Sequence, residues 1–171
     1  MTSRGSSEKH RSDTISYMDR SKRSLAIVDI ENYCGKSCLN QADVARAKGD
    51  ITTCVGNGMS NLFIVGTSHS SNFLNAKFAW PEAQHVFMAG RNGADLALIS
   101  AARLHLPNIC TFNKVYLLSG DGIFVRLTKE LHEAGAETYV VSLRRQFNRC
   151  LTTFASGVTL LDTEESQAKA S

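Results

Sequence analysis

Six short apolar segments separated by turn-forming residues constrain the fold of this 171-residue chain most strongly. Each segment is rich in Val, Ile, Leu or Phe and is bounded by Gly, Ser, Asn or Asp. The segments span residues 25–30, 62–66, 85–89, 115–119, 138–142 and 158–161. Because their apolar residues follow one another instead of alternating with polar ones, the pattern is typical of strands buried on both faces, as in a parallel sheet.

Helical patterns separate several of the predicted strands. Apolar residues recur at helical spacing over residues 124–134, and Gly135 follows as a stop signal. Similar stripes predict helices over residues 96–102 and 143–154. Strands that alternate with helices predict a three-layer α/β fold, in which helices cover both faces of a central, mostly parallel sheet of five to six strands.

The net charge of +3 lies in the N-terminal segment. Residues 1–23 hold six of the 19 basic residues and three of the 16 acidic ones, which leaves equal numbers of each sign in the rest of the chain. We expect a flexible basic tail over residues 1–23, one domain over residues 24–161 and a C-terminal tail over residues 162–171. Since the domain is neutral, it is not a globally basic nucleic-acid binder, and any such binding depends on a local site.

The composition favours a cytoplasmic location without a membrane partner. No apolar stretch approaches the roughly 20 residues that a membrane-spanning helix needs. The polar N-terminal segment lacks the apolar stretch of a signal peptide. The five cysteines are an odd number, which fits a reducing compartment better than a disulfide framework.

Three aspartates follow predicted strands or begin predicted helices. Asp29 lies at the end of the first strand, Asp121 lies in the turn SGDG after the fourth strand, and Asp95 begins the helix over residues 96–102. Because the carboxyl ends of parallel strands meet at one edge of a sheet, we expect these side chains to converge there. Converging carboxylates repel one another unless a cation lies between them. Hard oxygen ligands without a matching Cys or His set favour Mg²⁺ or Mn²⁺.

Each aspartate also has a purely structural interpretation. Asp29 and Asp121 could cap helices or bond to loops, and the helix dipole could stabilise Asp95. A charge at the end of a central strand is nevertheless costly unless it is paired or bound to metal. The three aspartates together therefore indicate a metal site of the kind that hydrolyses phosphodiester bonds.

Three motifs of this sequence resemble the NYN domain family, a branch of the PIN-like nuclease superfamily. They are DIEN at residues 29–32, GADLAL at residues 93–98 and SGDGIF at residues 119–124. Their order and spacing carry the resemblance, which covers about residues 24–161 and is closest to small bacterial members of the actinobacterial type. The resemblance implies a PIN-like Rossmannoid sheet and a metal-dependent endoribonuclease.

By motif position, the resemblance carries catalytic roles over to Asp29, Asn32, Asp95 and Asp121. The three aspartates would bind Mg²⁺ or Mn²⁺ directly or through water, and the asparagine would orient water or phosphate. Many relatives carry a further aspartate where this chain has Ile123. That departure favours the alternative, a catalytically weak or inactive module that binds RNA or another protein.

Further polar residues near the expected site are candidates for contact with single-stranded or structured RNA. Those beside the strand ends are Glu31, Ser119, Thr67 and Ser68, and the arginines are Arg91, Arg144 and Arg145. In a neutral domain, the arginines could follow the RNA backbone, or they could form a solvated helix face. His69 is a candidate for proton transfer. A homodimer is a further candidate assembly.

Overall fold

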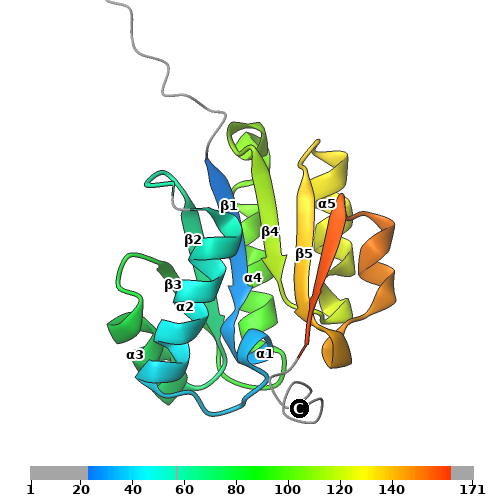
Figure 1. Ribbon diagram of the computed structural model, residues 1–171. Coiled ribbons are helices and arrows are strands. Elements are labelled where there is room, and N and C mark those ends of the chain that lie inside the picture. Colours follow the sequence, from blue (N-terminus) through cyan, green and yellow to red (C-terminus); the bar gives the residue numbers. More distant parts are fainter. Residues whose placement is uncertain (1–22, 57, 163–171) are drawn as a thin grey trace, which may run out of the picture.

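Six parallel strands form the central sheet of the computed structural model, which describes residues 23–56 and 58–162 (Figure 1). The strands are β1 (Ser24–Asp29), β2 (Leu62–Thr67), β3 (Gln84–Phe87), β4 (Lys114–Leu118), β5 (Thr138–Leu143) and β6 (Gly157–Leu161). Their order across the sheet is β3-β2-β1-β4-β5-β6, and every pairing is parallel. The predicted α/β class and the parallel sheet are confirmed.

The middle of the sheet is its most buried part. All six residues of β1 are buried, as the uninterrupted apolar run predicts. Strand β1 pairs with β2 on one side and with β4 on the other, so the chain leaves β1 and later returns to its opposite side. Such a reversal of the strand order leaves a crevice at the carboxyl ends of β1 and β4.

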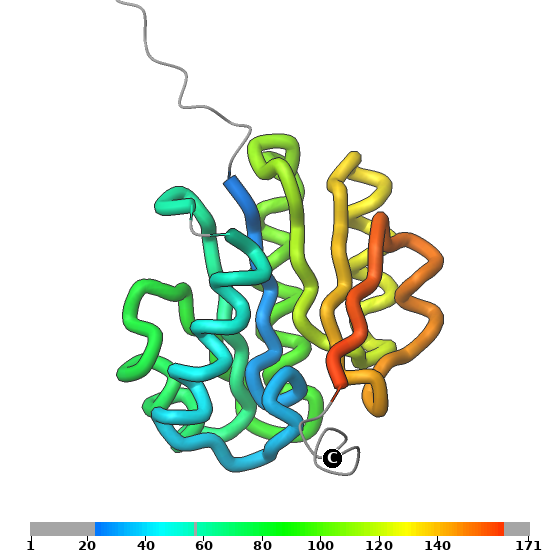
Figure 2. The backbone as a smooth tube through the Cα atoms, viewed as in Figure 1, coloured from blue at the N-terminus to red at the C-terminus, as the bar shows by residue number. Residues whose placement is uncertain are grey.

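Helices cover both faces of the sheet, as the trace of the backbone shows (Figure 2). They are α1 (Ile30–Cys34), α2 (Gln41–Val55), α3 (Ser70–Ala79), α4 (Gly93–Arg103) and α5 (Val125–Glu133). Alternate residues of β1 contribute to two cores. Leu25 and Ile27 pack with residues of α4 and α5, whereas Ala26 and Val28 pack with residues of α2 and α3.

Helices α2 and α3 are not among the helices predicted from the sequence, although α2 buries Val44, Ala47, Ile51 and Val55 along one face. Helix α2 begins with a capping box, in which Asn40 and Asp43 bond to each other's backbone. Helix α3 buries only Asn72 and Ala76. Its Phe78 is 71% exposed, so apolar periodicity gives little signal for this helix.

The predicted helix over residues 143–154 is wrong. Two short 3-10 helices, over residues 144–146 and 149–153, replace it. Between them, the backbone N–H of Asn148 donates to the carbonyl of Gly120 at 2.9 Å, and the side chain of Asn148 caps the second short helix. Contact with the turn after β4 thus interrupts the helical pattern.

The predicted tails, residues 1–23 and 162–171, lie outside the described residues except for Arg23 and Asp162. Within the described ranges, no helix has the length and apolar character needed to cross a membrane.

A glycine in β2 lets α4 approach the sheet closely. A Cβ atom on Gly66 would lie 2.4 Å from Cγ of Leu98, and the Leu98 side chain is fully buried. Gly66 is also the β2 residue paired with Asp29. The close approach therefore occurs beside the carboxyl end of β1.

We expect Gly66→Ala to lower the free energy of unfolding by about 1–3 kcal/mol, because the new methyl group overpacks the core. The matched control is Gly49→Ala in α2, where a Cβ meets nothing within 4 Å. This substitution should raise the free energy of unfolding by roughly 0.5–1 kcal/mol. Urea unfolding of both variants checks the expectation. Equal stability of the two variants would contradict the role assigned to Gly66.

Candidate functional site

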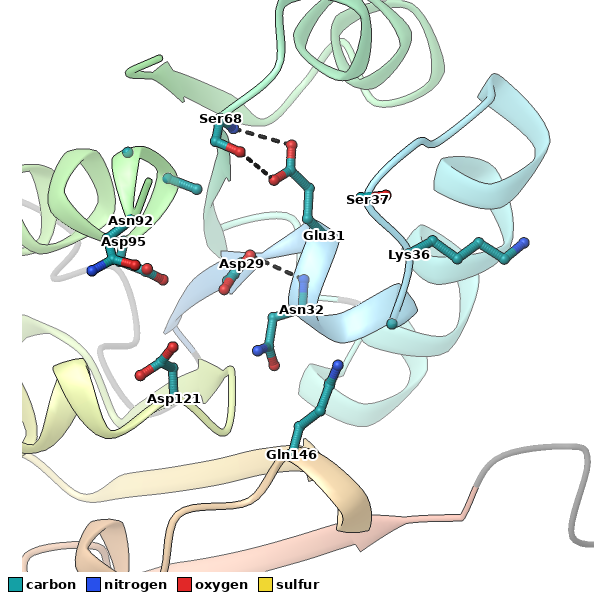
Figure 3. Close-up of a pocket in the computed structure, with 13 residues that line it drawn as sticks. Asp29, Glu31, Asn32, Lys36, Ser37, Ser68, Asn92, Asp95, Asp121 and Gln146 are labelled. Carbon is teal, nitrogen blue, oxygen red and sulfur yellow. Dashed lines mark hydrogen bonds between the residues drawn. The ribbon is translucent and has the colours of Figure 1, made fainter. Parts of the chain in front are cut away.

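Polar side chains gather at the carboxyl ends of β1 and β4, the two strands between which the order of the sheet reverses (Figure 3). They line a cleft of about 340 Å³. Its polar lining includes Asp29, Glu31, Asn32, Asp95 and Asp121. The structure therefore brings the three predicted aspartates and the predicted asparagine into one cleft.

Asp29 is held by the backbone that follows it. It ends β1 and caps α1, and its Oδ1 accepts a hydrogen bond from the backbone N–H of Asn32 at 3.1 Å. The hydroxyl of Ser119 donates to Oδ2 at 3.4 Å. Asp29 is only 5% exposed, so its position combines a helix cap with an almost buried carboxyl group.

The loop before α4 positions Asp95 opposite Asp29. Asn92 precedes the helix with a left-handed φ of 58°, and a Cβ on Gly93 would lie 1.9 Å from the carbonyl oxygen of Met88. Glycine is thus required at the start of the helix, two residues before Asp95. The carboxyl groups of Asp29 and Asp95 are close enough to share a hydrogen bond when one is protonated.

Burial and neighbouring negative charge raise the pKa values of two aspartates. Burial is the largest effect on Asp29, and the charge of Asp95 adds to it, so that its pKa rises to about 8 despite the hydrogen bond from Asn32. Burial, followed by the charge of Asp121, raises the pKa of Asp95. The cleft therefore concentrates negative charge that a bound cation would compensate.

The turn after β4 is tied to both Asp29 and α1. The backbone N–H of Gly120 donates to Oδ1 of Asn32 at 3.2 Å. Asp121 caps the 3-10 helix Gly122–Phe124 by accepting the N–H of Ile123 at 3.0 Å. The side chain of Ile123 packs against the core, so this residue supplies no ligand to the cleft.

Glu31 bonds to the loop that follows β2. Its carboxylate accepts hydrogen bonds from the backbone and hydroxyl of Ser68, at 3.1 and 2.6 Å, and from Nδ2 of Asn72 at 2.7 Å. The backbone N–H of His69 also donates to it at 3.3 Å. Burial alone would raise the pKa of Glu31, but these hydrogen bonds outweigh burial and lower it.

Asn72 is a site residue that the sequence interpretation missed. It is fully buried, and besides Glu31 it bonds to the carbonyl of Ser37 and the N–H of Leu39. In the sequence, Asn72 is a single polar residue in a helix without an apolar stripe, and such a residue by itself gives little indication of a role in the site.

The other predicted substrate contacts divide into two groups. Ser68 lines the cleft, and Arg145 lines a neighbouring one. Thr67 and Ser119 are 1% and 0% exposed, and neither lines the cleft; Ser119 instead bonds to Asp29. Arg91 and Arg144 are exposed but are not among the lining residues, and Arg144 pairs with Asp162 at 2.9 Å.

The raised pKa of Asp29 gives a stability prediction for the metal-free protein. Folding raises this pKa from 3.8 to about 8, so the fold favours the protonated form. This contribution to stability is complete below about pH 4 and is lost as the pH rises through about 8. We expect Asp29→Asn to melt at least roughly 5 °C above the wild type at pH 8 in chelator, because ionising the buried carboxyl group there costs several kcal/mol, and we expect the difference to shrink towards pH 4.

The control for this comparison is Asp50→Asn, which removes an exposed carboxylate of α2. Its melting temperature should equal that of the wild type at both pH values. Thermal unfolding followed by circular dichroism measures all three proteins. A melting temperature of Asp29→Asn that stays below that of the wild type at pH 8 would refute the unfavourable burial of this charge.

Comparison with known proteins agrees with this geometry. Among curated proteins, none matches the sequence. A crystal structure of a protein of unknown function from Vibrio parahaemolyticus is similar in fold, with a TM-score of 0.55 and 17% sequence identity over 84% of this chain and 95% of that one. The sequence profile of the NYN domain matches residues 28–162, which include all three aspartates. The chain belongs to the NYN domain family.

Proposed function

We propose that this protein is a metal-dependent endoribonuclease that hydrolyses RNA phosphodiester bonds in the carboxylate cleft. The observation that carries the proposal is the convergence of Asp29, Asp95 and Asp121 in one cleft at the switch point of a parallel sheet. Family membership supports it, because NYN and PIN-like proteins are generally nucleases that use divalent metals.

The donor set of the cleft fits Mg²⁺ or Mn²⁺, which prefer carboxylate, amide and water oxygens. In the described ranges, no group of three or more His, Cys, Asp or Glu side chains is already arranged around one ion position. Asp29, Asp95 and Asp121 would hold the ion, directly or through water, as Mg²⁺ sites commonly do. When bound, the ion supplies Lewis acidity and lowers the pKa of coordinated water.

The protein's own groups orient the reactants. Because Oδ1 of Asn32 accepts the N–H of Gly120, the amide NH₂ of Asn32 is left to donate to a phosphate oxygen or to water. Asp29 keeps its orientation through its hydrogen bonds to Asn32 and Ser119. Glu31 is already bonded to several donors, so we assign it a positioning role and not a ligand role.

A second candidate function follows from Ile123. Since its side chain packs against the core, the cleft lacks one carboxylate that many relatives have. A catalytically weak or inactive module that binds RNA or a protein partner is the function this feature favours. The two candidates differ in their requirement for metal.

We expect the purified protein to cleave labelled single-stranded or structured RNA in the presence of Mn²⁺. Cleavage should stop when a chelator removes the metal. Asp29→Asn should lower the rate by at least about 100-fold, because loss of a ligand costs more than the 10–100-fold typical of residues that only support ligands. Asp50→Asn is the matched control and should keep the wild-type rate. Equal cleavage by the wild type and Asp29→Asn would exclude the proposed mechanism.

Calorimetric titration with Mn²⁺ separates the two candidate functions. A nuclease of this kind binds the ion, and Asp95→Asn should weaken that binding severely. A wild-type protein that neither binds Mn²⁺ nor cleaves RNA would support the interaction module instead.

The basic N-terminal segment should assist RNA capture. Residues 1–23 include six basic and three acidic residues, and attraction between cationic groups and phosphates weakens as salt rises. Deleting them should lower RNA affinity at low salt, measured by fluorescence anisotropy, and leave Mn²⁺ affinity unchanged. An unchanged RNA affinity would show that the segment takes no part in binding.

A further inference from the structure

A second cleft adjoins the carboxylate cleft and is lined by different chemistry. It has a volume of about 430 Å³ and lies between α1, the turn after β4 and residues 145–148. It shares Asn32, Asp121 and Gln146 with the first cleft. Adjacent nucleotides of one RNA strand could therefore occupy the two clefts.

Arg145 supplies the positive charge of the second cleft. Its guanidinium lies over the end of α1, where one nitrogen is 3.5 Å from the carbonyl oxygen of Gly35. A Cβ on Gly35 would lie 2.5 Å from the same nitrogen, so a side chain at position 35 would displace the guanidinium from this place. No carboxylate of the described chain pairs with Arg145, whereas the neighbouring Arg144 pairs with Asp162. The guanidinium thus retains donors for a phosphate.

Amide side chains supply neutral hydrogen-bond donors, since Oδ1 of Asn148 already accepts the N–H of Cys150 at 2.9 Å. Gln146 borders both clefts and extends towards Asn32 (Figure 3), and its Oε1 is buried without a hydrogen-bond partner in the described structure. Asn148 contributes a second amide, and the partly buried Phe147 contributes an apolar wall. Such a combination suits the edge and face of an unpaired nucleobase.

The second cleft and the carboxylate of Asp121 belong to one packed unit. A Cβ on Gly120 would lie 2.6 Å from the carbonyl oxygen of Gln146, and a Cβ on Gly122 would lie 2.3 Å from Nδ2 of Asn148. The N–H of Asn148 also bonds to the carbonyl of Gly120. Residues 146–148 therefore keep a defined position relative to the acidic site.

We propose that the second cleft is a nucleotide subsite, which binds the unit next to the scissile phosphate in single-stranded RNA. Arg145 would bind the phosphate of that unit, and Gln146 and Asn148 would face the edge of its base. The inference rests on the proposed nuclease function. The two clefts differ in charge. The carboxylate cleft repels phosphate unless a cation is present, whereas Arg145 attracts phosphate without one.

Binding in chelator tests the subsite without catalysis. The probe is a fluorescent single-stranded RNA hexamer, titrated with the full-length protein at low salt. Arg145→Gln should weaken binding by about 10-fold and reduce the salt dependence of log affinity by about 1, the value for one phosphate contact. Arg144→Gln removes a neighbouring charge outside the cleft and should stay within about two-fold of the wild type. Thermal unfolding checks that both variants fold.

The amide contact has its own variant. Gln146→Met keeps the length of the side chain and removes its hydrogen-bonding groups. The wild type should distinguish among hexamers of the four bases, and Gln146→Met should reduce that difference while its binding still depends on Arg145. Duplex RNA of the same length should bind more weakly, because its base edges are already paired.

These measurements separate failure of the subsite from failure of the nuclease. No wild-type binding in chelator, or equal losses for Arg144→Gln and Arg145→Gln, would overturn the subsite even if Mn²⁺-dependent cleavage is present. Arg145-dependent binding by a protein that never cleaves RNA would uphold the subsite and overturn the nuclease proposal.

Discussion

The burial of negative charge at the carboxyl end of β1 is the constraint on which the rest of the site depends. The ionised form of an aspartate that is 5% exposed and adjoins a second carboxyl group is unfavourable, because burial and repulsion both oppose its charge. The chain offsets part of this cost locally, through the N–H of Asn32 and the hydroxyl of Ser119. These bonds fix the orientation of Asp29 but leave the negative charge of the cleft uncompensated, which is the condition that a divalent cation satisfies.

The sheet creates this condition through topology. Strands β2 and β4 flank β1 on opposite sides, so three chain segments that are distant in sequence end at the same place. Gly66 then lets Leu98 approach the sheet, and Asp95, about one turn earlier in α4, lies beside Asp29. Close packing in the core and repulsion in the cleft are therefore consequences of the same placement of α4.

The strands and the three aspartates could be predicted because both depend on local sequence. An uninterrupted apolar run signals a buried strand, and residues that follow such strands share an edge of the sheet. The failed helix over residues 143–154 depends instead on Gly120, which contacts Asn148 from far away in the sequence. Adjacent arginines pose the same difficulty: only the fold shows that Arg145 lines a cleft and that Arg144 pairs with Asp162.

A neutral domain can still attract a polyanion when its charges are separated in space. Equal numbers of basic and acidic residues follow residue 23, yet the acidic groups at the functional edge converge around Asp29 while Arg145 lies in the adjoining cleft. A cation would turn the first cleft from repelling phosphate to attracting it, whereas Arg145 would attract phosphate to the second cleft with or without a cation. Because Ile123 packs against the core and supplies no carboxylate to the first cleft, the proposed endoribonuclease would depend more strongly on the second cleft to orient its RNA substrate.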